Sequence, residues 1–159
     1  MKKGFFIVLF LLTSFFAFSK ELTEFDDIDF GTHENKVIAL MESKGYKASF
    51  PAPNVVSFTK PNETYLECNV KEYVFVFSSV DNNLISYAII LDRKNRTIYK
   101  DAPTYFKTKY NAEIDDTIIS NPAIDIFKIP FSDNSCILLI DTKLTEYIIR
   151  FCKYDVWLD

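Results

Sequence analysis

The clearest pattern along the chain is an alternation of apolar side chains with a period of two. In residues 72–78, Tyr73, Phe75 and Phe77 point to one side and valines to the other. Such alternation is typical of a β-strand. Because both sides are apolar, we expect a central strand that is at least partly covered on both faces, with the three aromatic residues in the main core.

Other strands follow from the same pattern and from the turn residues between them. The polar segments 81–83 and 141–143 predict turns that join neighbouring antiparallel strands. The last strand alternates in the way expected for a half-buried strand. The further predicted strands are Val55–Thr59, Leu84–Leu91, Ala123–Ile129, Ser135–Ile140 and Leu144–Cys152.

Helical spacing of apolar residues occurs in two segments. The first predicts a helix over His33–Lys44, with Thr32 as its N-cap and Gly45 as a left-handed C-cap. The second lies before Asn111. Because proline fits only the first turn of a helix, Pro103 places the start of that helix near Asp101.

The order of helix, strands, helix and strands predicts an α+β fold. We expect an antiparallel sheet with two main helices packed on one face. No internal linker or strong repeat is evident, so residues 20–159 are expected to form a single domain.

Several of these features together resemble a known family. They are Phe-Gly-Thr at 30–32, the helix that ends at Gly45, the aromatic hairpin 73–91, and Lys-Tyr-Asn at 109–111 before a final hairpin. The pattern resembles the small secreted bacterial domains of the β-lactamase-inhibitor-protein and SmpA/OmlA-like fold. The usual Lys-Tyr-Gly is here Lys-Tyr-Asn, and the lipoprotein cysteine is missing. The resemblance implies a class of domains that mostly bind other proteins, and it assigns no functional residue.

The start of the chain has the form of a signal peptide. Two lysines precede the apolar run 5–18, and Ala17 and Ser19 place small residues where a signal peptidase reads them. We therefore predict that residues 1–19 are removed near Ser19. The run is short for a membrane span. The mature protein is expected to be extracytoplasmic, either periplasmic or secreted, with no stable membrane anchor.

The charge balance argues against several partners. The chain has a net charge of −4, which falls to −6 once the two lysines of the leader are removed. An acidic domain of this kind lacks the clustered cations that nucleic acid requires, and it is a poor ligand for anionic lipid. We expect no nucleic-acid partner.

Residues suited to catalysis or metal binding are sparse. The single histidine, His33, has no motif partner for zinc or for a nucleophilic serine. Gly31 and Gly45 serve helix ends, which leaves no phosphate cradle. The acidic pairs 26–27 and 115–116 lie in polar stretches that read as solvated turns. We predict no catalytic, cofactor-binding or metal-binding residue, and therefore no enzyme and no cofactor.

Three cysteines follow the leader: Cys68, Cys136 and Cys152. They can form one disulfide and one thiol, or remain three buried thiols. An even-length turn between the last two strands would place Cys136 and Cys152 on opposite faces, where they cannot bond. Any disulfide would then join Cys68 to one of them. An odd-length turn would place both on one face.

Aromatic residues near the ends of elements are the candidate interface. These are Tyr65, Tyr99 and Trp157, because exposed aromatic side chains commonly anchor protein interfaces; Trp157 is equally suited to sealing the core. We expect a non-enzymatic domain whose sheet face or loops bind another extracytoplasmic protein. The alternatives are a lipid- or ligand-binding protein, which requires a cavity of a few hundred Å³ as an order of magnitude, and a secreted hydrolase, which requires two converging acids.

Overall fold

The computed structural model describes residues 25, 27–93, 97–112, 115–131 and 133–154, and the predicted leader lies outside them. The side chains of 97–100 and 115–119 also lie outside this description. The helices are α1 (Glu34–Ser43) and α2 (Thr97–Tyr110). The described strands are β1 (Lys47–Ala52), β2 (Val55–Thr59), β3 (Thr64–Tyr65), β4 (Cys68–Phe77), β5 (Leu84–Asp92), β6 (Asp115–Ser120), β7 (Asp125–Pro130), β8 (Cys136–Asp141) and β9 (Glu146–Cys152).

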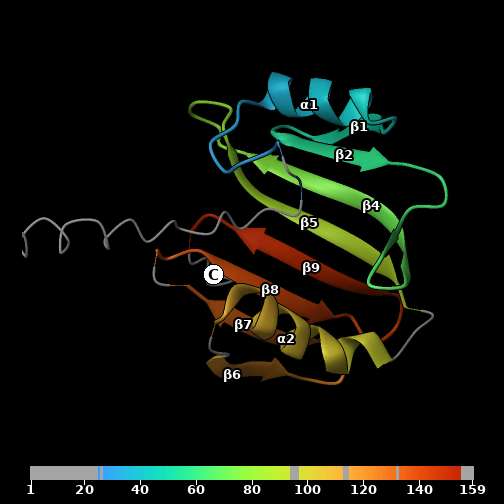
Figure 1. Ribbon diagram of the computed structural model, residues 1–159, viewed down its shortest axis with the longest axis vertical. Helices are drawn as coiled ribbons and strands as arrows, with labels where there is room; N and C mark the ends of the chain where they lie inside the picture. The colour runs from blue at the N-terminus through green and yellow to red at the C-terminus, as the bar shows by residue number, and fades with distance from the viewer. Residues whose placement is uncertain (1–24, 26, 94–96, 113–114, 132, 155–159) are drawn as a thin grey trace, which may run out of the picture.

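One antiparallel sheet organises the fold. Its strands lie in the order β1-β2-β4-β5-β9-β8-β7-β6, and the short β3 pairs with β4 (Figure 1). Helix α1 precedes the meander β1-β2-β4-β5, and α2 precedes the meander β6-β7-β8-β9. The last strands of the two meanders, β5 and β9, pair at the centre of the sheet. The chain therefore repeats one topology, helix followed by four-stranded meander, within a continuous sheet. No strong repeat was found along the chain in the sequence analysis.

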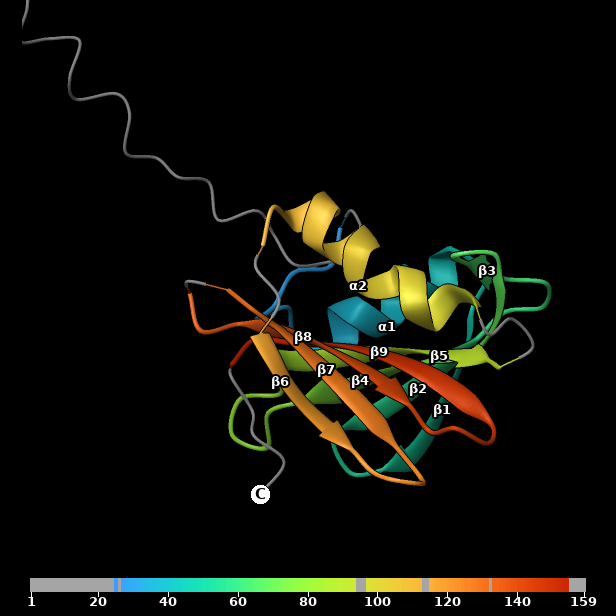
Figure 2. The same cartoon turned by 90° about the horizontal axis from the view of Figure 1, so that it is seen from below.

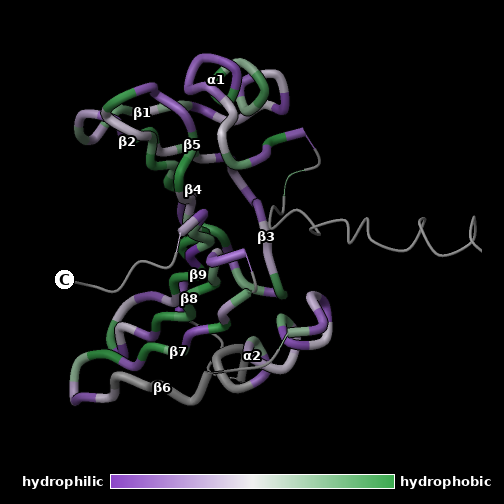
Figure 3. The backbone as a smooth tube through the Cα atoms, turned by 90° about the vertical axis from the view of Figure 1, so that its left-hand side faces the viewer, coloured by the Kyte–Doolittle hydropathy of each residue, from purple (hydrophilic) through white to green (hydrophobic). Residues whose placement is uncertain are grey.

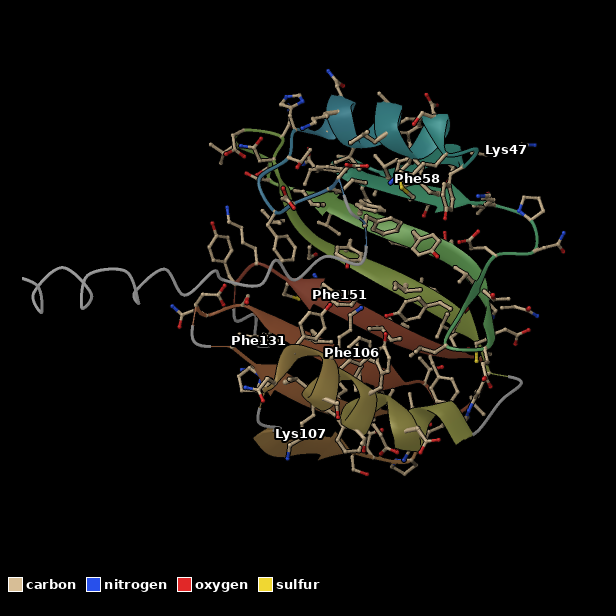
Figure 4. All side chains as sticks on the ribbon, in the orientation of Figure 1. Lys47, Phe58, Phe106, Lys107, Phe131 and Phe151 are labelled. Carbon is tan, nitrogen blue, oxygen red and sulfur yellow. The ribbon has the colours of Figure 1, made fainter. Side chains whose placement is uncertain are left out.

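The two helices lie on the same side of the sheet, as Figure 2 shows. The strand residues on that side are largely aromatic, and they pack beneath the helices to form the main core. Tyr73, Phe75 and Phe77 are at most 4% exposed, which confirms the prediction that they belong to the core. Phe106 of α2 reaches Phe151 of β9, with ring centroids 5.9 Å apart (Figure 4).

The predicted α+β class is wrong, because the described chain is mostly antiparallel sheet and its two helices are short. Helix α1 has 10 residues and α2 has 14. The sheet is larger than expected because β1, β3 and β6 were not predicted as strands. Segment 115–116, read as a solvated turn, lies in β6. Edge strands of this kind form by pairing their backbone with a neighbour, with little help from side-chain alternation.

The ends of α1 are fixed by local hydrogen bonds. His33 rather than Thr32 is the N-cap, and its Nδ1 accepts a hydrogen bond from the Asn35 N–H at 3.3 Å. At the other end, Gly45 has φ of 87°, which confirms the left-handed cap. The N–H of Tyr46 donates to the Met41 carbonyl at 3.1 Å, the long hydrogen bond of a Schellman motif.

Helix α2 begins earlier than its proline predicts. It starts at Thr97, so Pro103 lies inside the helix and not in its first turn. The ring removes one backbone donor from the interior of α2. Its C-terminal end repeats that of α1, since Asn111 has φ of 49° and the Ala112 N–H donates to the Lys107 carbonyl.

The register of the last hairpin overturns the predicted placement of two cysteines. Asp141 pairs with Tyr147, which leaves the odd-length segment 142–146 as the connection. Cys136 therefore pairs directly with Cys152, and both side chains lie on one face of the sheet. The prediction of opposite faces assumed an even turn and is wrong.

Candidate functional site

Of the three predicted interface residues, Tyr65 is the one whose side chain the structure describes. Tyr65 is half-buried on β3 and packs against the main core. The backbone of Tyr99 lies in α2, but its side chain is outside the described residues, as is all of Trp157. Tyr65 is therefore placed to pack, and the other two positions stay predictions.

The sheet face turned away from the helices has a different composition from the core face. We call it the open face, because no described helix covers it (Figure 2). The strand register places its side chains in cross-strand rows; one of them pairs Asp92 with Glu146, and three others are described below. The aromatic side chains of β4, β5 and β9 lie on the opposite, helix-covered face, and the rows described below are aliphatic and polar.

The isoleucine row crosses four adjacent strands. The register pairs Ile90 with Ile148, Ile148 with Ile140, and Ile140 with Ile126. Three of the four side chains are half-buried and Ile126 is buried. The hydropathy colours in Figure 3 show apolar stretches along the same strands. The row is therefore a continuous aliphatic stripe on a face without a helix.

The arginine row lies beside the isoleucine row and brings charge to the centre of the open face. Arg150 of β9 sits between Ala88 and Leu138 on the neighbouring strands. Its Nη2 donates to Ser86 Oγ at 3.2 Å, and in the described residues it forms no ion pair. Lys128 lies one strand beyond Leu138 in the same row and is 6% exposed.

Glu72 lies at the end of the isoleucine row and is hydrogen-bonded to Ser57, not to Arg150. It pairs with Ile90 and accepts a hydrogen bond from Ser57 Oγ at 2.7 Å. Its carboxylate therefore does not neutralise Arg150. Within the part of the chain that the structure describes, the guanidinium has the Ser86 hydroxyl as its side-chain acceptor.

The third row is the cysteine row, at the other end of the face. It pairs Ser86 with Cys152, Cys152 with Cys136, and Cys136 with Pro130. Both cysteines are fully buried and belong to a small cluster with Leu138 and Ile140, separate from the main core.

A buried ion pair lies on the helix-covered side. Arg93 Nη2 is 3.2 Å from Asp141 Oδ2, with side chains only 17% and 6% exposed. Asp141 also accepts the Lys143 N–H at 2.7 Å. It is the one buried carboxylate of the described residues. Its ion-pair partner is a cation, and a second acid, Asp125, is its direct cross-strand partner on β7.

Asp125 extends this charged region toward the surface. It accepts a hydrogen bond from Ser120 Oγ at 2.7 Å and lies 2.9 Å from Lys143 Nζ. The hydrogen bond from Ser120, followed by that from Lys143, lowers the pKa of the Asp125 carboxyl. A carboxyl with a lowered pKa is a poor general acid.

A second cluster joins the residue after the C-terminal cap of α1 to the segment that precedes β3. Tyr46 donates its hydroxyl hydrogen to Glu63 Oε1 at 2.9 Å, and Lys60 Nζ lies 3.8 Å from the same carboxylate. Burial first, and then the hydrogen bond to Glu63, raises the pKa of Tyr46 to about 12. The neighbouring Tyr73 also has a raised pKa, mainly through burial. The hydroxyl of Tyr46 therefore stays protonated at neutral pH and keeps its hydrogen bond to Glu63.

A small cavity lies between α2 and the sheet. It is lined by Leu91, Ala102, Leu139 and Tyr147 among others, and its volume is about 10 Å³. This is room for one water molecule. A lipid or drug-sized ligand needs a far larger space, on the order of 300 Å³.

His33 has a structural role in the described fold. It is exposed and its Nδ1 caps α1. Across the described residues, no three His, Cys, Asp or Glu side chains gather in a group able to hold a metal ion. Neither described helix has the length and hydrophobicity needed to cross a bilayer.

Comparison with known proteins gives no match: no protein-family model, curated protein or solved structure shows significant similarity to the chain. The candidate site is therefore argued from its own residues. Its central members, Arg150 and the isoleucine row, were not predicted as site residues. The signal available in the sequence was the polar-apolar alternation of 146–152, whose outward positions were read only as half-buried.

Proposed function

We propose that this chain is a non-enzymatic protein-binding domain whose open face docks a partner protein. The observation that carries the proposal is Arg150, which has no ion-pair partner among the described residues and lies beside the isoleucine row. Three of the four isoleucines are half-buried, so part of this stripe reaches solvent, and exposed apolar surface commonly marks an interaction site. The resemblance to a class of protein-binding domains points the same way.

The charge on the open face defines the chemistry of the partner. A guanidinium binds a carboxylate through two parallel hydrogen bonds, and these are stronger in apolar surroundings than in water. The aliphatic stripe next to it favours aliphatic side chains of the partner. We therefore commit to a partner protein that presents an apolar segment carrying an aspartate or glutamate, with the acid seated on Arg150.

The face supports docking by its rigidity. Arg150 projects from β9, which pairs with a strand on each side, and Ser86 holds one end of its guanidinium. A side chain positioned in this way loses little freedom on binding, which favours affinity.

A peptide-display experiment tests the proposal. A phage library of random peptides is selected on the purified protein, and the enriched peptides are measured against the Arg150→Gln and Ile148→Asp variants. We expect peptides that combine aliphatic residues with Asp or Glu. Affinity should fall at least ~10-fold in Arg150→Gln, about the effect of one lost charge-assisted hydrogen bond, and binding should be abolished in Ile148→Asp.

Lys107→Gln is the matched control. Lys107 is exposed on α2, on the helix side of the sheet (Figure 4). The control removes one positive charge without touching the open face, so it should bind the selected peptides like the parent. Peptides without acids, or equal binding to Arg150→Gln and to the control, would overturn the proposal.

We also propose that the protein acts outside the cytoplasm, after removal of residues 1–19. The supporting observation is the leader-like pattern of charge, apolar run and small residues. Expression of the whole chain in a bacterial host, followed by intact-mass measurement of the exported protein, tests this. The expected N-terminus is Lys20, and a chain that retains Met1 or carries a lipid would contradict the proposal.

A further inference from the structure

The cysteine row places two thiols directly opposite each other on neighbouring strands. Cys136 of β8 pairs with Cys152 of β9, and both are 0% exposed. Residues paired in this way have Cα atoms about 4.5–5.5 Å apart. The Cα separation of a disulfide is roughly 4.4–6.8 Å. The backbone therefore holds the two residues at bonding distance without any movement of the strands.

The third cysteine lies elsewhere in the fold. Cys68 begins β4, belongs to the main core, and pairs with Tyr65. Val70, two residues further on, pairs with Leu91, which in turn pairs with Tyr147 at the opposite end of β9 from Cys152. At a rise of about 3.3 Å per residue, Cys68 is more than ~15 Å from either of the other two sulfurs. It cannot compete for the bond.

We propose that Cys136 and Cys152 are a modification site at which a cross-strand disulfide ties β8 to β9. In this reaction the thiolate of one cysteine attacks the disulfide of an oxidant, such as glutathione disulfide or the active-site disulfide of a thiol oxidase. The resulting mixed disulfide is then attacked by the other cysteine. Two electrons pass to the oxidant, which leaves as two thiols, and the two cysteines end as one S–S bond.

Burial sets the time at which the bond forms. Both thiols are sealed in the cluster with Leu138 and Ile140, so an oxidant reaches them only before the hairpin has closed. The bond therefore forms during folding, and the folded protein resists its reduction. Such a bond closes the loop 137–151 and fixes the edge of the open face at the cysteine row.

Oxidative refolding tests the proposal on the purified full chain. The protein is unfolded in guanidinium chloride with dithiothreitol and then refolded in either a mixture of reduced and oxidised glutathione or dithiothreitol alone. Remaining thiols are alkylated, and peptides are mapped without reduction. In glutathione we expect a Cys136–Cys152 linked peptide and an alkylated Cys68. The urea midpoint should be about 1–2 M higher than that of the reduced protein.

Single-cysteine variants provide the controls. Cys68→Ser should still yield the linked peptide, whereas Cys136→Ser and Cys152→Ser should yield none. The mapping of the parent protein decides the matter even if a variant fails to fold. A peptide that links Cys68 to either partner, or alkylation of both Cys136 and Cys152 after refolding in glutathione, would overturn the proposal.

Discussion

The rings of Phe75 and Tyr87 stack across the centre of the sheet, with centroids 5.4 Å apart and planes within 18° of each other. Tyr87 stacks in turn on Phe151 at 4.6 Å. These residues occupy one cross-strand row on the helix-covered face, from β4 through β5 to β9. The aromatic row thus crosses the boundary between the two halves of the fold and joins their cores.

Truncation of Phe75 should therefore destabilise the whole domain. Phe75 is 0% exposed and also contacts the rings of Phe25 and Phe58. We expect Phe75→Ala to lower the free energy of unfolding by about 3–5 kcal/mol, as for other buried phenylalanines. Val74→Ala is the control, because Val74 is half-buried on the open face. It should cost less than about 1.5 kcal/mol. Urea unfolding measures both, and a loss below ~1 kcal/mol for Phe75→Ala would mean that this strand is peripheral.

The proline inside α2 gives a test of where the helix begins. With the helix starting at Thr97, an N–H at position 103 would bond to the carbonyl of Tyr99. Pro103→Ala should restore that hydrogen bond and stabilise the protein by about 1–3 kcal/mol. If the helix instead begins near Asp101, position 103 needs no partner and the thermal midpoint should not change. Thermal unfolding of the variant beside the parent distinguishes the two.

High pH should unfold the protein through its buried phenols. A tyrosine in the unfolded chain loses its proton near pH 10, whereas burial and the bond to Glu63 raise the pKa of Tyr46 to about 12 in the folded state. The folded protein thus holds its proton more tightly, so this contribution to stability is complete below about pH 10 and is lost as the pH rises toward 12. Tyr73, whose pKa is also raised by burial, acts in the same direction.

Urea midpoints measured from pH 9 to 12 check this prediction. The midpoint should fall across the upper part of the range, and Tyr46→Phe should make the fall shallower because one titrating group is gone. Tyr154→Phe is the control, since Tyr154 is 55% exposed. A slope that Tyr46→Phe leaves unchanged would remove Tyr46 from the explanation.

The sequence predicted those elements in which side-chain pattern and local chemistry agree. Val55–Thr59 is confirmed as β2, and the alternation around Phe75 located β4 and its buried face. The glycine at 45 located the end of α1 because its positive φ is a local property. The strands β1 and β6 were missed because an edge strand is held by backbone pairing with a neighbour that no local pattern identifies.

The repeated topology of the fold also corresponds to a weak similarity between two segments of the sequence, which the sequence analysis did not identify. Leu84, Tyr87 and Ile89 of β5 recur with the same spacing as Leu144, Tyr147 and Ile149. In the structure Ile89 pairs with Ile149 at the centre of the sheet, so the two segments meet as equivalent strands. The candidate site could not be predicted because it is assembled from rows across strands. Row membership depends on turn lengths, and a change of one residue moves a side chain to the other face.

The last prediction concerns the buried ion pair between Arg93 and Asp141. Arg93 is also within 5.7 Å of the Tyr147 ring centroid, so its guanidinium is held on two sides. Arg93→Met keeps the volume of the side chain but leaves the Asp141 carboxylate buried without a cation. Removing one partner of such a pair typically costs about 3–5 kcal/mol.

Adding Asp141→Asn removes the unpaired charge, so the double variant should recover at least half of the loss. Urea unfolding of the parent, both single variants and the double variant gives the coupling energy of the pair. A cost below ~1 kcal/mol for Arg93→Met, or no recovery in the double variant, would show that solvent already screens the charge of Asp141 and that this pair does not tie the end of β5 to the end of β8.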